Sequence, residues 1–255
     1  YFRANVDRAG FVCQHGRILI PVPERLPVVR FERKTMLETT ILGFDEKSFR
    51  SQTASAIALR PQIEEVVDQL QERGFANLFL IGAGGTYAAM WPYEHLARRS
   101  STLPVRSVIA AELLESGDAS LGSDSVAIFT TVSGTTDDSL RAIEYCKERG
   151  VTTIAFTGYA DSPIAQAADI ALVSEPKTWP FDFQLLLFMT RLLSVRGEFD
   201  GYERFADELT ALPDVLVAVA EQAEPVAAKF AEEHADDDYH FLVGGGNLWG
   251  FTYLY

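Results

Sequence analysis

Basic residues and cysteine are scarce in this chain of 255 residues. Its 22 Lys and Arg stand against 36 Asp and Glu, which gives a formal net charge of −14. The phosphates of nucleic acids and of anionic membrane surfaces repel such a chain, so we expect neither as a partner. The two cysteines, Cys13 and Cys146, lie far apart and lack the spacing of metal ligands. This cysteine usage indicates a reducing, cytoplasmic compartment, and we expect no metal and no cofactor.

Long apolar runs are also missing. No segment approaches the roughly 20 apolar residues that span a bilayer. The most hydrophobic stretch, residues 181–193, is interrupted by Asp182, Gln184 and Arg191, so we interpret it as a buried helix. Arg, Asp and His interrupt every apolar stretch in the first 20 residues, so no signal peptide is visible. The composition is that of an ordinary globular protein.

The N-terminal segment differs from the rest in charge. Residues 1–34 contain seven Arg or Lys and three acidic residues, which makes this segment basic in an acidic chain. Pro21, Pro23 and Pro27 exclude a helix and a central strand, and a short strand is expected near residues 17–23. We describe residues 1–34 as a basic N-terminal arm and assign it no function.

From residue 48 onward, apolar residues recur with helical and strand periodicity. Pro61 opens a helical segment and Gly74 ends it as a C-terminal cap. The expected strands are residues 78–81, 105–108, 126–130, 152–156 and 170–173, and the expected helices are residues 87–98, 137–149, 164–168 and 180–195, followed by a helical region at 202–233. This alternation over residues 48–195 predicts an α/β fold with a doubly wound, three-layer α-β-α parallel sheet.

One internal repeat suggests a second domain. The sequence of residues 79–85, an apolar strand that runs into glycines, recurs in similar form at residues 241–247, 162 residues further on. This offset is about the length of one α/β domain. We therefore expect residues 238–255 to begin a second similar domain, with residues 196–237 as a helical connector. Chance similarity of two Gly-rich strand ends is the alternative.

The first Gly-rich loop follows the strand at residues 78–81. Such a turn exposes backbone N–H groups at a helix N-terminus, where the helix dipole favours anions. The spacing of Gly82 and Gly84 also fits a dinucleotide-binding turn, but Tyr87 replaces the third glycine. No acidic residue ends the strand at residues 105–108 to hold a ribose, so a dinucleotide is disfavoured.

The second loop, residues 131–136, is rich in hydroxyl groups. Thr131, Ser133, Thr135 and Thr136 surround Gly134 just before a predicted helix N-terminus. A phosphate carries acceptor oxygens only, so a set of O–H and N–H donors suits it. The alternative is that Thr135 or Thr136 merely caps the helix. Capping needs one hydroxyl and the loop offers four, so we favour ligand binding.

This second loop resembles the S-x-S-G-x-T phosphate signature of sugar-isomerase (SIS) domains, with Thr131, Ser133, Gly134 and Thr136 at the matching positions. Gly84-Gly85-Thr86 resembles the first loop of these domains, which contacts the sugar. Residues 58–63, with a central proline, resemble the helix that precedes their first strand. Within the family, Gly82 to Ala88 with Pro92 looks most like the fructosamine-6-phosphate deglycase branch. The resemblance covers residues 48–195.

The resemblance implies a sugar phosphate as ligand. Its expected binding residues are Gly84, Gly85, Thr86, Thr131, Ser133, Gly134, Thr136 and Thr178. Thr131 replaces the usual serine and keeps the hydroxyl, while the segment around Thr178 departs from the family pattern. The family's catalytic glutamate lies on a helix of the second domain, which is expected beyond Tyr255. No catalytic residue is therefore placed in this chain.

Three functions fit the resemblance. The first is a deglycase that converts a fructosamine 6-phosphate to an amine and glucose 6-phosphate. An aldose–ketose phosphosugar isomerase, or an isomerase like that of glucosamine-6-phosphate synthase, shares every site residue. A non-catalytic sugar-phosphate sensor is the third. SIS domains usually pair, so a homodimer is expected, with the apolar stretch at residues 181–193 as the candidate interface.

Two further features have ordinary explanations beside functional ones. Glu112 follows the strand at residues 105–108 and would orient a sugar hydroxyl or simply be solvated. The acidic run at residues 236–238 is metal-like in composition but is typical of a solvated turn.

Overall fold

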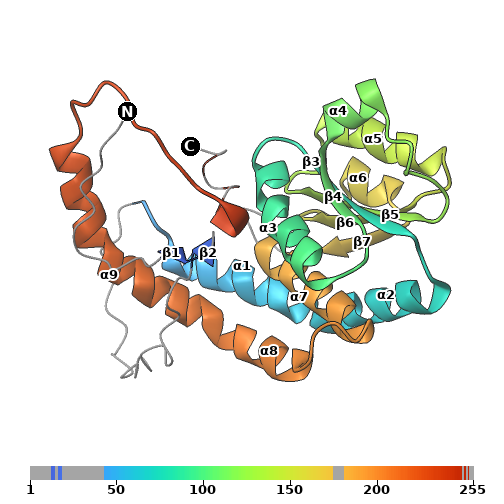
Figure 1. Ribbon diagram of the computed structural model, residues 1–255, viewed down its shortest axis with the longest axis horizontal. Helices are drawn as coiled ribbons and strands as arrows, with labels where there is room; N and C mark the ends of the chain where they lie inside the picture. Colours follow the sequence, from blue (N-terminus) through green and yellow to red (C-terminus); the bar gives the residue numbers. More distant parts are fainter. Residues whose placement is uncertain are drawn as a thin grey trace. The chain divides into compact units, whose positions relative to one another are not determined.

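The computed structural model describes residues 13–14, 17–18, 43–174, 181–248, 250 and 252. The chain divides into two compact units, Tyr1–Glu38 and Thr39–Tyr255. In the first unit, β1 (Cys13–Gln14) pairs antiparallel with β2 (Arg17–Ile18), so the strand expected near residues 17–23 is present at its start. The rest of that expectation lies outside the described residues. The other elements that the structure describes belong to the second unit (Figure 1).

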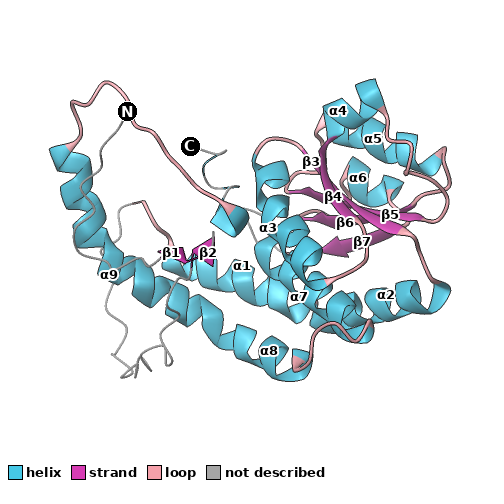
Figure 2. Cartoon of the chain, viewed as in Figure 1, coloured by secondary structure: helices cyan, strands magenta, loops and turns pink. Residues whose placement is uncertain are grey.

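A five-stranded parallel sheet forms the centre of the second unit, as predicted (Figure 2). Its strands are β3 (Asn77–Gly82), β4 (Val105–Ile109), β5 (Ser125–Thr131), β6 (Thr152–Thr157) and β7 (Ile170–Val173). They lie in the order β4-β3-β5-β6-β7, and every neighbouring pair is parallel. The chain thus turns from β3 to one side and then returns to the other, which makes the sheet doubly wound.

Helices flank the sheet along its length. The described helices are α1 (Glu46–Ala58), α2 (Arg60–Arg73), α3 (Gly85–Ser100), α4 (Ala110–Ser116), α5 (Asp137–Lys147), α6 (Pro163–Ala167), α7 (Phe181–Val195), α8 (Tyr202–Glu208) and α9 (Leu212–Glu233), with 3-10 turns η1 (Leu209–Ala211) and η2 (Gly246–Leu248). Pro61 stands in the first turn of α2 and Gly74 caps its end, as predicted. Among the described helices, none is long and apolar enough to cross a membrane.

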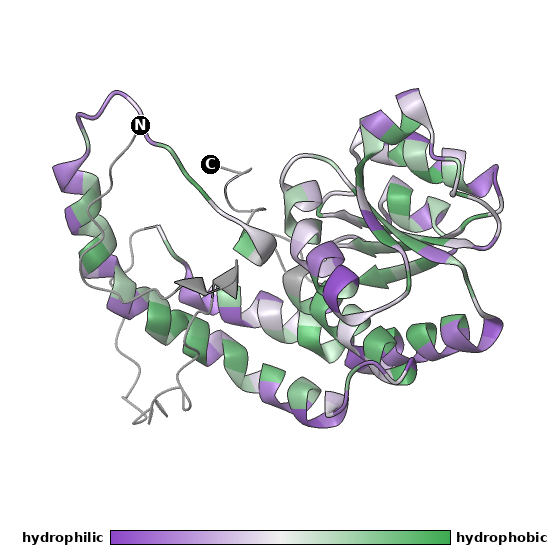
Figure 3. Ribbon diagram, in the orientation of Figure 1, coloured by the Kyte–Doolittle hydropathy of each residue, from purple (hydrophilic) through white to green (hydrophobic). Residues whose placement is uncertain are grey.

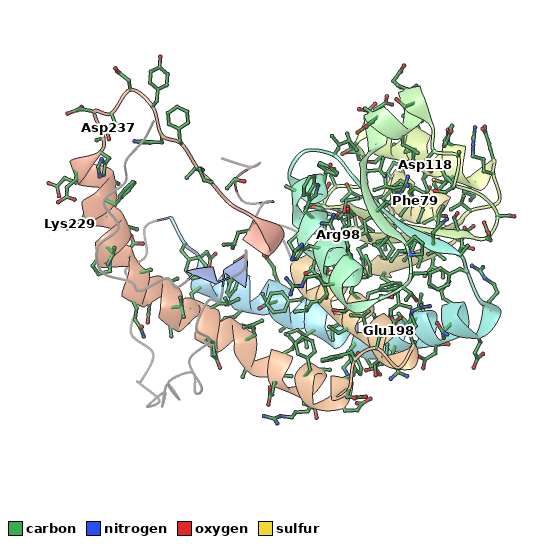
Figure 4. All side chains as sticks on the ribbon, in the orientation of Figure 1. Phe79, Arg98, Asp118, Glu198, Lys229 and Asp237 are labelled. Atoms are coloured by element: carbon green, nitrogen blue, oxygen red, sulfur yellow. The ribbon has the colours of Figure 1, made fainter. Side chains whose placement is uncertain are left out.

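The strand side chains alternate between two separate cores, one on each face of the sheet. Leu78 and Leu80 point into a core with α2, α3 and α7, whereas Phe79 and Ile81 point into a core with α4, α5 and α6 (Figure 4 labels Phe79). Burial on both faces explains the nearly continuous apolar runs that predicted parallel strands. This is the three-layer arrangement expected from the sequence.

Several details differ from the sequence-based predictions. The short helix α4 was not predicted, and the helical region at residues 202–233 is divided by the 3-10 turn η1. Residues 241–243, expected as the first strand of a second domain, lie in no strand. Phe241 and Val243 instead expose 89% and 94% of their surface.

The apolar helix α7 is a core element of the domain. Leu185, Leu187, Phe188 and Met189 are fully buried, and α7 packs against α2, α3 and α1. Burial by this chain's own sheet and helices explains the apolar composition of this stretch. The interpretation of this stretch as a buried helix is confirmed.

A group of ion pairs attaches α8 to α2 and α7. Arg60 contacts Glu64 at 2.6 Å, Asp207 at 2.6 Å and Glu203. Arg191 forms a two-point hydrogen bond with Asp68, at 2.9 and 2.7 Å. Both guanidinium groups lie over the ring of Tyr202, whose hydroxyl donates to Glu64 at 2.9 Å, and burial raises the pKa of that hydroxyl. These contacts fix the point from which α9 continues.

Candidate functional site at the carboxyl ends of the strands

The two loops singled out in the sequence lie side by side at the carboxyl ends of the strands, which we call the ligand edge of the sheet. β3 and β5 are paired neighbours, with Ile81 opposite Phe129, so the loops that follow them start from adjacent strand ends. The chain leaves β3 toward β4 and leaves β5 toward β6, in opposite directions. Open α/β sheets bind ligands at such a switch point, outside the carboxyl ends of the strands. The topology therefore places Gly84–Thr86 and Thr131–Thr136 where a ligand is expected.

Glycine is required in the first loop because the backbone approaches itself closely. A Cβ atom on Gly82 would lie 2.6 Å from the Tyr87 nitrogen and 2.9 Å from Thr86 Oγ1. Gly84, the N-cap residue of α3, has a φ of +54°, which favours glycine. These constraints bring the start of α3 back over the end of β3. The helix N-terminus consequently faces the ligand edge.

The Thr86 hydroxyl is directed into the first loop. Its Oγ1 atom lies 3.0 Å from both the nitrogen and the oxygen of Ala83, accepting from the former and donating to the latter. Thr86 was expected to be one of the residues that contact the ligand. In the structure the hydroxyl holds the turn, and Gly84 is the exposed residue of the loop.

Thr131 has a similar internal role in the second loop. Its side chain is buried, 5% exposed, and Oγ1 accepts a hydrogen bond from the Gly134 nitrogen at 3.1 Å. Gly134 has a φ of +66°, and a Cβ atom there would lie 2.4 Å from Ser162 Oγ. The Gly134 carbonyl accepts from the Ile164 nitrogen at 3.2 Å. The centre of this loop is therefore tied to α6.

Ser162 is a supporting residue that the sequence analysis missed. It is the N-cap of α6, where its Oγ accepts from the Ala165 nitrogen at 3.3 Å and donates to the Tyr159 carbonyl at 2.7 Å. Oγ also lies 3.4 Å from Thr157 Oγ1 at the end of β6. The sequence did contain a signal for this N-cap, because a serine directly before a proline, here Pro163, is typical of a helix start. The sequence could not predict that Ser162 lies next to Gly134, because the sheet brings these two residues together.

Three hydroxyl groups of the second loop remain on the surface. Ser133, Thr135 and Thr136 are exposed, and Ser133 Oγ lies 2.9 Å from Thr135 Oγ1. Thr136 occupies the N-cap position of α5, yet its side chain makes no capping hydrogen bond. The expectation that Thr135 or Thr136 caps this helix by a hydroxyl is thus wrong for Thr136. The first N–H groups of α5 lack that acceptor and face the same edge as the hydroxyls.

This arrangement presents donors to an anion. Exposed hydroxyls and unsatisfied helix N–H groups match the acceptor oxygens of a phosphate, and the dipole of α5 favours negative charge there. The carboxylates of Asp137 and Asp138 lie in the first turn of α5, and Asp138 is 3.9 Å from Arg141 Nη1. Local donors, rather than the net charge of the chain, would attract the anion.

The remaining predicted residues have different placements. Thr178 lies outside the described residues. Glu112 is exposed in the first turn of α4 and lines a hollow of about 340 Å³ beside the edge strand β4, away from the second loop. Cys146 is a core residue, as expected, and burial raises the pKa of its thiol to about 12. Asp237 of the acidic run pairs with His234 at 2.7 Å.

A buried polar pair lies near the same edge. Gln184 of α7 is fully buried, and its Nε2 donates to Ser174 Oγ at 2.8 Å just after β7. The Ser174 nitrogen donates in turn to the carbonyl of Thr157. Among the described residues, Oε1 of Gln184 and Oγ1 of Thr130 find no hydrogen-bond partner. The sequence analysis placed both residues in buried elements, but it did not indicate which hydrogen bonds their side chains would make.

Comparison with protein families agrees with the geometry. The family model of the SIS domain matches residues 73–194, which include both loops. The chain contains a SIS domain. The match covers the sheet and the helices α3 to α7, and the helices α8 and α9 follow it.

The curated relatives of this chain are distant. It is 24% identical over 204 residues to fructosamine deglycase FrlB of Bacillus subtilis, an alignment that covers 76% of this chain and 61% of the relative. It is 28% identical over 193 residues to fructoselysine 6-phosphate deglycase of Escherichia coli O157:H7, covering 74% and 56%. A glutamine–fructose-6-phosphate aminotransferase of Pyrobaculum aerophilum is 26% identical, covering 77% and 33%. The chain thus spans less than two thirds of the length of these relatives.

Solved structures show the same fold. A Bacillus subtilis crystal structure assigned to the phosphosugar isomerases superposes with a TM-score of 0.70 at 22% identity, covering 79% of this chain and 64% of that one. The C-terminal domain of glucosamine-fructose-6-phosphate aminotransferase from Francisella tularensis gives 0.67 at 16% identity, covering 81% and 63%. At these identities the likeness establishes the SIS fold.

Proposed function

We propose that this SIS domain binds a sugar phosphate at the carboxyl ends of β3 and β5. The observation that carries the proposal is the second loop, where Ser133 and Thr136 expose hydroxyl groups beside an uncapped helix N-terminus at the switch point of the sheet. The phosphate is held by these hydroxyls and by N–H groups at the start of α5. The sugar lies toward the backbone of Gly84 and Gly85. Thr131, Gly134 and Thr86 hold the loops in shape.

The proposed reaction is the cleavage of a fructosamine 6-phosphate to an amine and glucose 6-phosphate. Two relatives named as deglycases support this choice, and their alignments cover about three quarters of this chain. In such a reaction a carboxylate moves protons between C1 and C2 of the bound sugar, and water then releases the amine. The SIS domain described here supplies the anchoring of the phosphate, and we place no general base in it.

A phosphosugar isomerase is the second candidate. Isomerising aminotransferases are also among the relatives, and the anchoring residues are the same for both reactions. Incubation of the chain with a fructosyl-amino-acid 6-phosphate and, separately, with fructose 6-phosphate distinguishes them by product analysis. Amine release supports the deglycase, and aldose formation from the free ketose phosphate supports the isomerase. Binding without turnover of either would favour the sensor.

The repeat at residues 241–247 supports a further proposal, that residues 238–255 begin a second α/β domain. Phe241, Leu242 and Val243 are 89, 54 and 94% exposed, although their composition is that of a buried strand. An apolar strand sequence outside any sheet lacks the neighbours that normally cover it. A longer version of the chain that protects these amides from hydrogen exchange would support this proposal, and rapid exchange there would contradict it.

The site is tested by replacing the two exposed hydroxyls. The double variant Ser133→Ala/Thr136→Ala removes two hydrogen bonds to a charged phosphate, so we expect affinity for glucose 6-phosphate to fall on the order of 100-fold. Calorimetry measures the dissociation constant. The control is Ser100→Ala/Ser123→Ala, since these two serines are exposed at the end of α3 and just before β5, at the opposite edge of the sheet. Unchanged affinity in the test variant would refute the site.

A further inference from the structure

Two deeply buried polar side chains at the ligand edge each keep one hydrogen-bonding atom without a partner. Thr130, the last residue but one of β5, is 2% exposed, and Gln184, in the first turn of α7, is fully buried. Among the described residues, neither Oγ1 of Thr130 nor Oε1 of Gln184 has a hydrogen-bond partner. Buried polar groups are nearly always paired, because an unpaired one lowers the stability of the fold. Two exceptions at one edge of the sheet therefore need an explanation.

Both side chains lie on the same face of the sheet. Alternate residues of β5, up to Ile128, point into the core with α7, so Thr130 points to that face as well. Phe156, the strand partner of Thr130, packs edge to face on Phe188 of α7, with the ring centroids 6.3 Å apart. Gln184 precedes Phe188 by one helical turn, on the side of the ligand edge. The aromatic pair thus closes the core beneath both polar groups.

Neighbouring polar side chains at this edge are paired within the protein. Thr131 Oγ1 accepts from the Gly134 nitrogen, and Ser162 caps α6. Gln184 itself is held at one end, since its Nε2 donates to Ser174 Oγ at 2.8 Å just after β7. That hydrogen bond fixes the amide group and leaves its other end, Oε1, in a set direction. Stabilisation of the loops explains the paired groups, but it does not explain the unpartnered atoms.

The surroundings of these two atoms favour apolar side chains. β7 and α7 consist mostly of hydrophobic residues (Figure 3). Valine has the shape of Thr130 and methionine has nearly that of Gln184, and neither would bury an unpartnered oxygen at these positions. Polar groups kept where apolar ones would be at least as stable are typical of functional sites.

We propose that Thr130 and Gln184 bind hydroxyl groups of the sugar part of the ligand, on the inner side of the crevice between the two loops. This assignment rests on the proposed function, in which the second loop holds the phosphate. The strand register places Thr130 beside Gly82, at the switch point itself. A threonine hydroxyl donates and accepts, and an amide oxygen accepts, so both suit the O–H groups of a sugar. The bound sugar supplies the partners that the folded chain lacks, which favours a ligand with hydroxyls at these positions over a deoxy analogue.

Two nearly isosteric substitutions test this assignment. In Thr130→Val and in Gln184→Met, the affinity for glucose 6-phosphate measured by calorimetry should fall on the order of 10-fold, because each variant loses one hydrogen bond to the sugar. The affinity for inorganic phosphate, measured by its competition with glucose 6-phosphate, should not change. Thr190→Val is the matched control, because Thr190 is 6% exposed on the same helix and its hydroxyl donates to the Leu186 carbonyl at 2.5 Å. Both affinities should stay unchanged in that variant, and circular dichroism checks that all three variants are folded.

Three results would overturn the assignment, each for a different reason. Unchanged affinity for glucose 6-phosphate in both variants would mean that the two atoms bind ordered water only. An equal loss of affinity for inorganic phosphate and for glucose 6-phosphate would mean that the two side chains shape the second loop and do not contact the sugar. If the unaltered chain bound no glucose 6-phosphate at all, the proposed function would be contradicted, and the assignment of Thr130 and Gln184 with it.

Discussion

The two loops at the carboxyl edge of the sheet use the same kind of residue in opposite ways. In the loop after β3, the hydroxyl of Thr86 forms hydrogen bonds with the backbone of Ala83 and stabilises the turn. In the loop after β5, Thr131 has this internal role, while Ser133 and Thr136 stay on the surface. A hydroxyl in a Gly-rich loop is therefore not by itself a ligand contact. Its burial and its nearest backbone groups decide its role.

This difference predicts that substitutions in the two groups of residues have different effects, one on stability and the other on ligand affinity. Hydroxyls and glycines that shape a loop should affect the free energy of unfolding, and exposed hydroxyls should affect ligand affinity with little change in stability. Four substitutions test the comparison, in order of decreasing effect on stability.

Gly134→Ala should destabilise the domain most. The new Cβ would lie 2.4 Å from Ser162 Oγ and 2.9 Å from Ile164 Cγ2, at a φ of +66° that disfavours alanine. Strain and overpacking together should lower the free energy of unfolding by about 2–4 kcal/mol, as measured by urea denaturation. Gly84→Ala is the control, because its φ is also positive but nothing lies within 4 Å of the added atom. That variant should lose only about 1 kcal/mol. Equal losses would show that the loop is not tied to α6.

Thr131→Val should cost about 1–3 kcal/mol, because it leaves the buried N–H of Gly134 without its acceptor. The neighbouring Thr130→Val is a close control. Thr130 is equally buried, but its Oγ1 has no hydrogen-bond partner among the described residues. That substitution should be neutral or stabilising in thermal unfolding. A larger loss for Thr130→Val than for Thr131→Val would contradict the assignment of Thr131 as the residue that holds the loop.

Thr86→Val should cost about 1 kcal/mol, less than Thr131→Val, since the hydrogen bonds to Ala83 are only partly buried and water replaces them. Thr86→Ser keeps the hydroxyl and should retain most of the stability. Chemical denaturation compares the two. If Thr86→Val left stability unchanged but abolished sugar-phosphate binding, Thr86 would be a ligand contact after all.

Ser133→Ala should change the free energy of unfolding by less than about 0.5 kcal/mol, because Ser133 is exposed and its Oγ contacts Thr135, which is exposed as well. Calorimetry should nevertheless show weaker binding of glucose 6-phosphate. A stability loss comparable to that of Thr131→Val would remove the distinction between the two kinds of hydroxyl.

Much of the fold was predictable because its signals are local. The strand at residues 170–173 was predicted with its observed bounds, and the other four were extended by one or two residues in the structure. Parallel strands that are buried on both faces have apolar sequences, which makes them recognisable. Pro61 and Gly74 mark the start and the end of a helix through their own backbone preferences. The short α4 was missed because seven residues give too little periodicity.

The site was only partly predictable for a different reason. Glycines and hydroxyls located both loops, but whether Thr136 caps a helix or Thr86 faces a ligand depends on side-chain direction, which sequence spacing does not specify. Ser162 and the pair Gln184–Ser174 came from distant segments, and only the sheet brings them to the same edge. Two helices with apolar side chains show the same limit, since α7 is covered by the sheet and its neighbours whereas Val219 and Val226 of α9 are exposed.

The sequence by itself determined the succession of strands and helices along the chain, the two Gly-rich loops, and the set of hydrogen-bond donors in the second loop that suits a phosphate. These follow from apolar periodicity, from the backbone freedom of glycine and from the chemistry of hydroxyl groups. The tertiary structure alone decided which hydroxyls form hydrogen bonds within their own loops and that both loops meet at the switch point. It also decided which helix is buried in the core and which one is exposed. Those outcomes depend on contacts between residues far apart in the chain, and such contacts exist only once the sheet has formed.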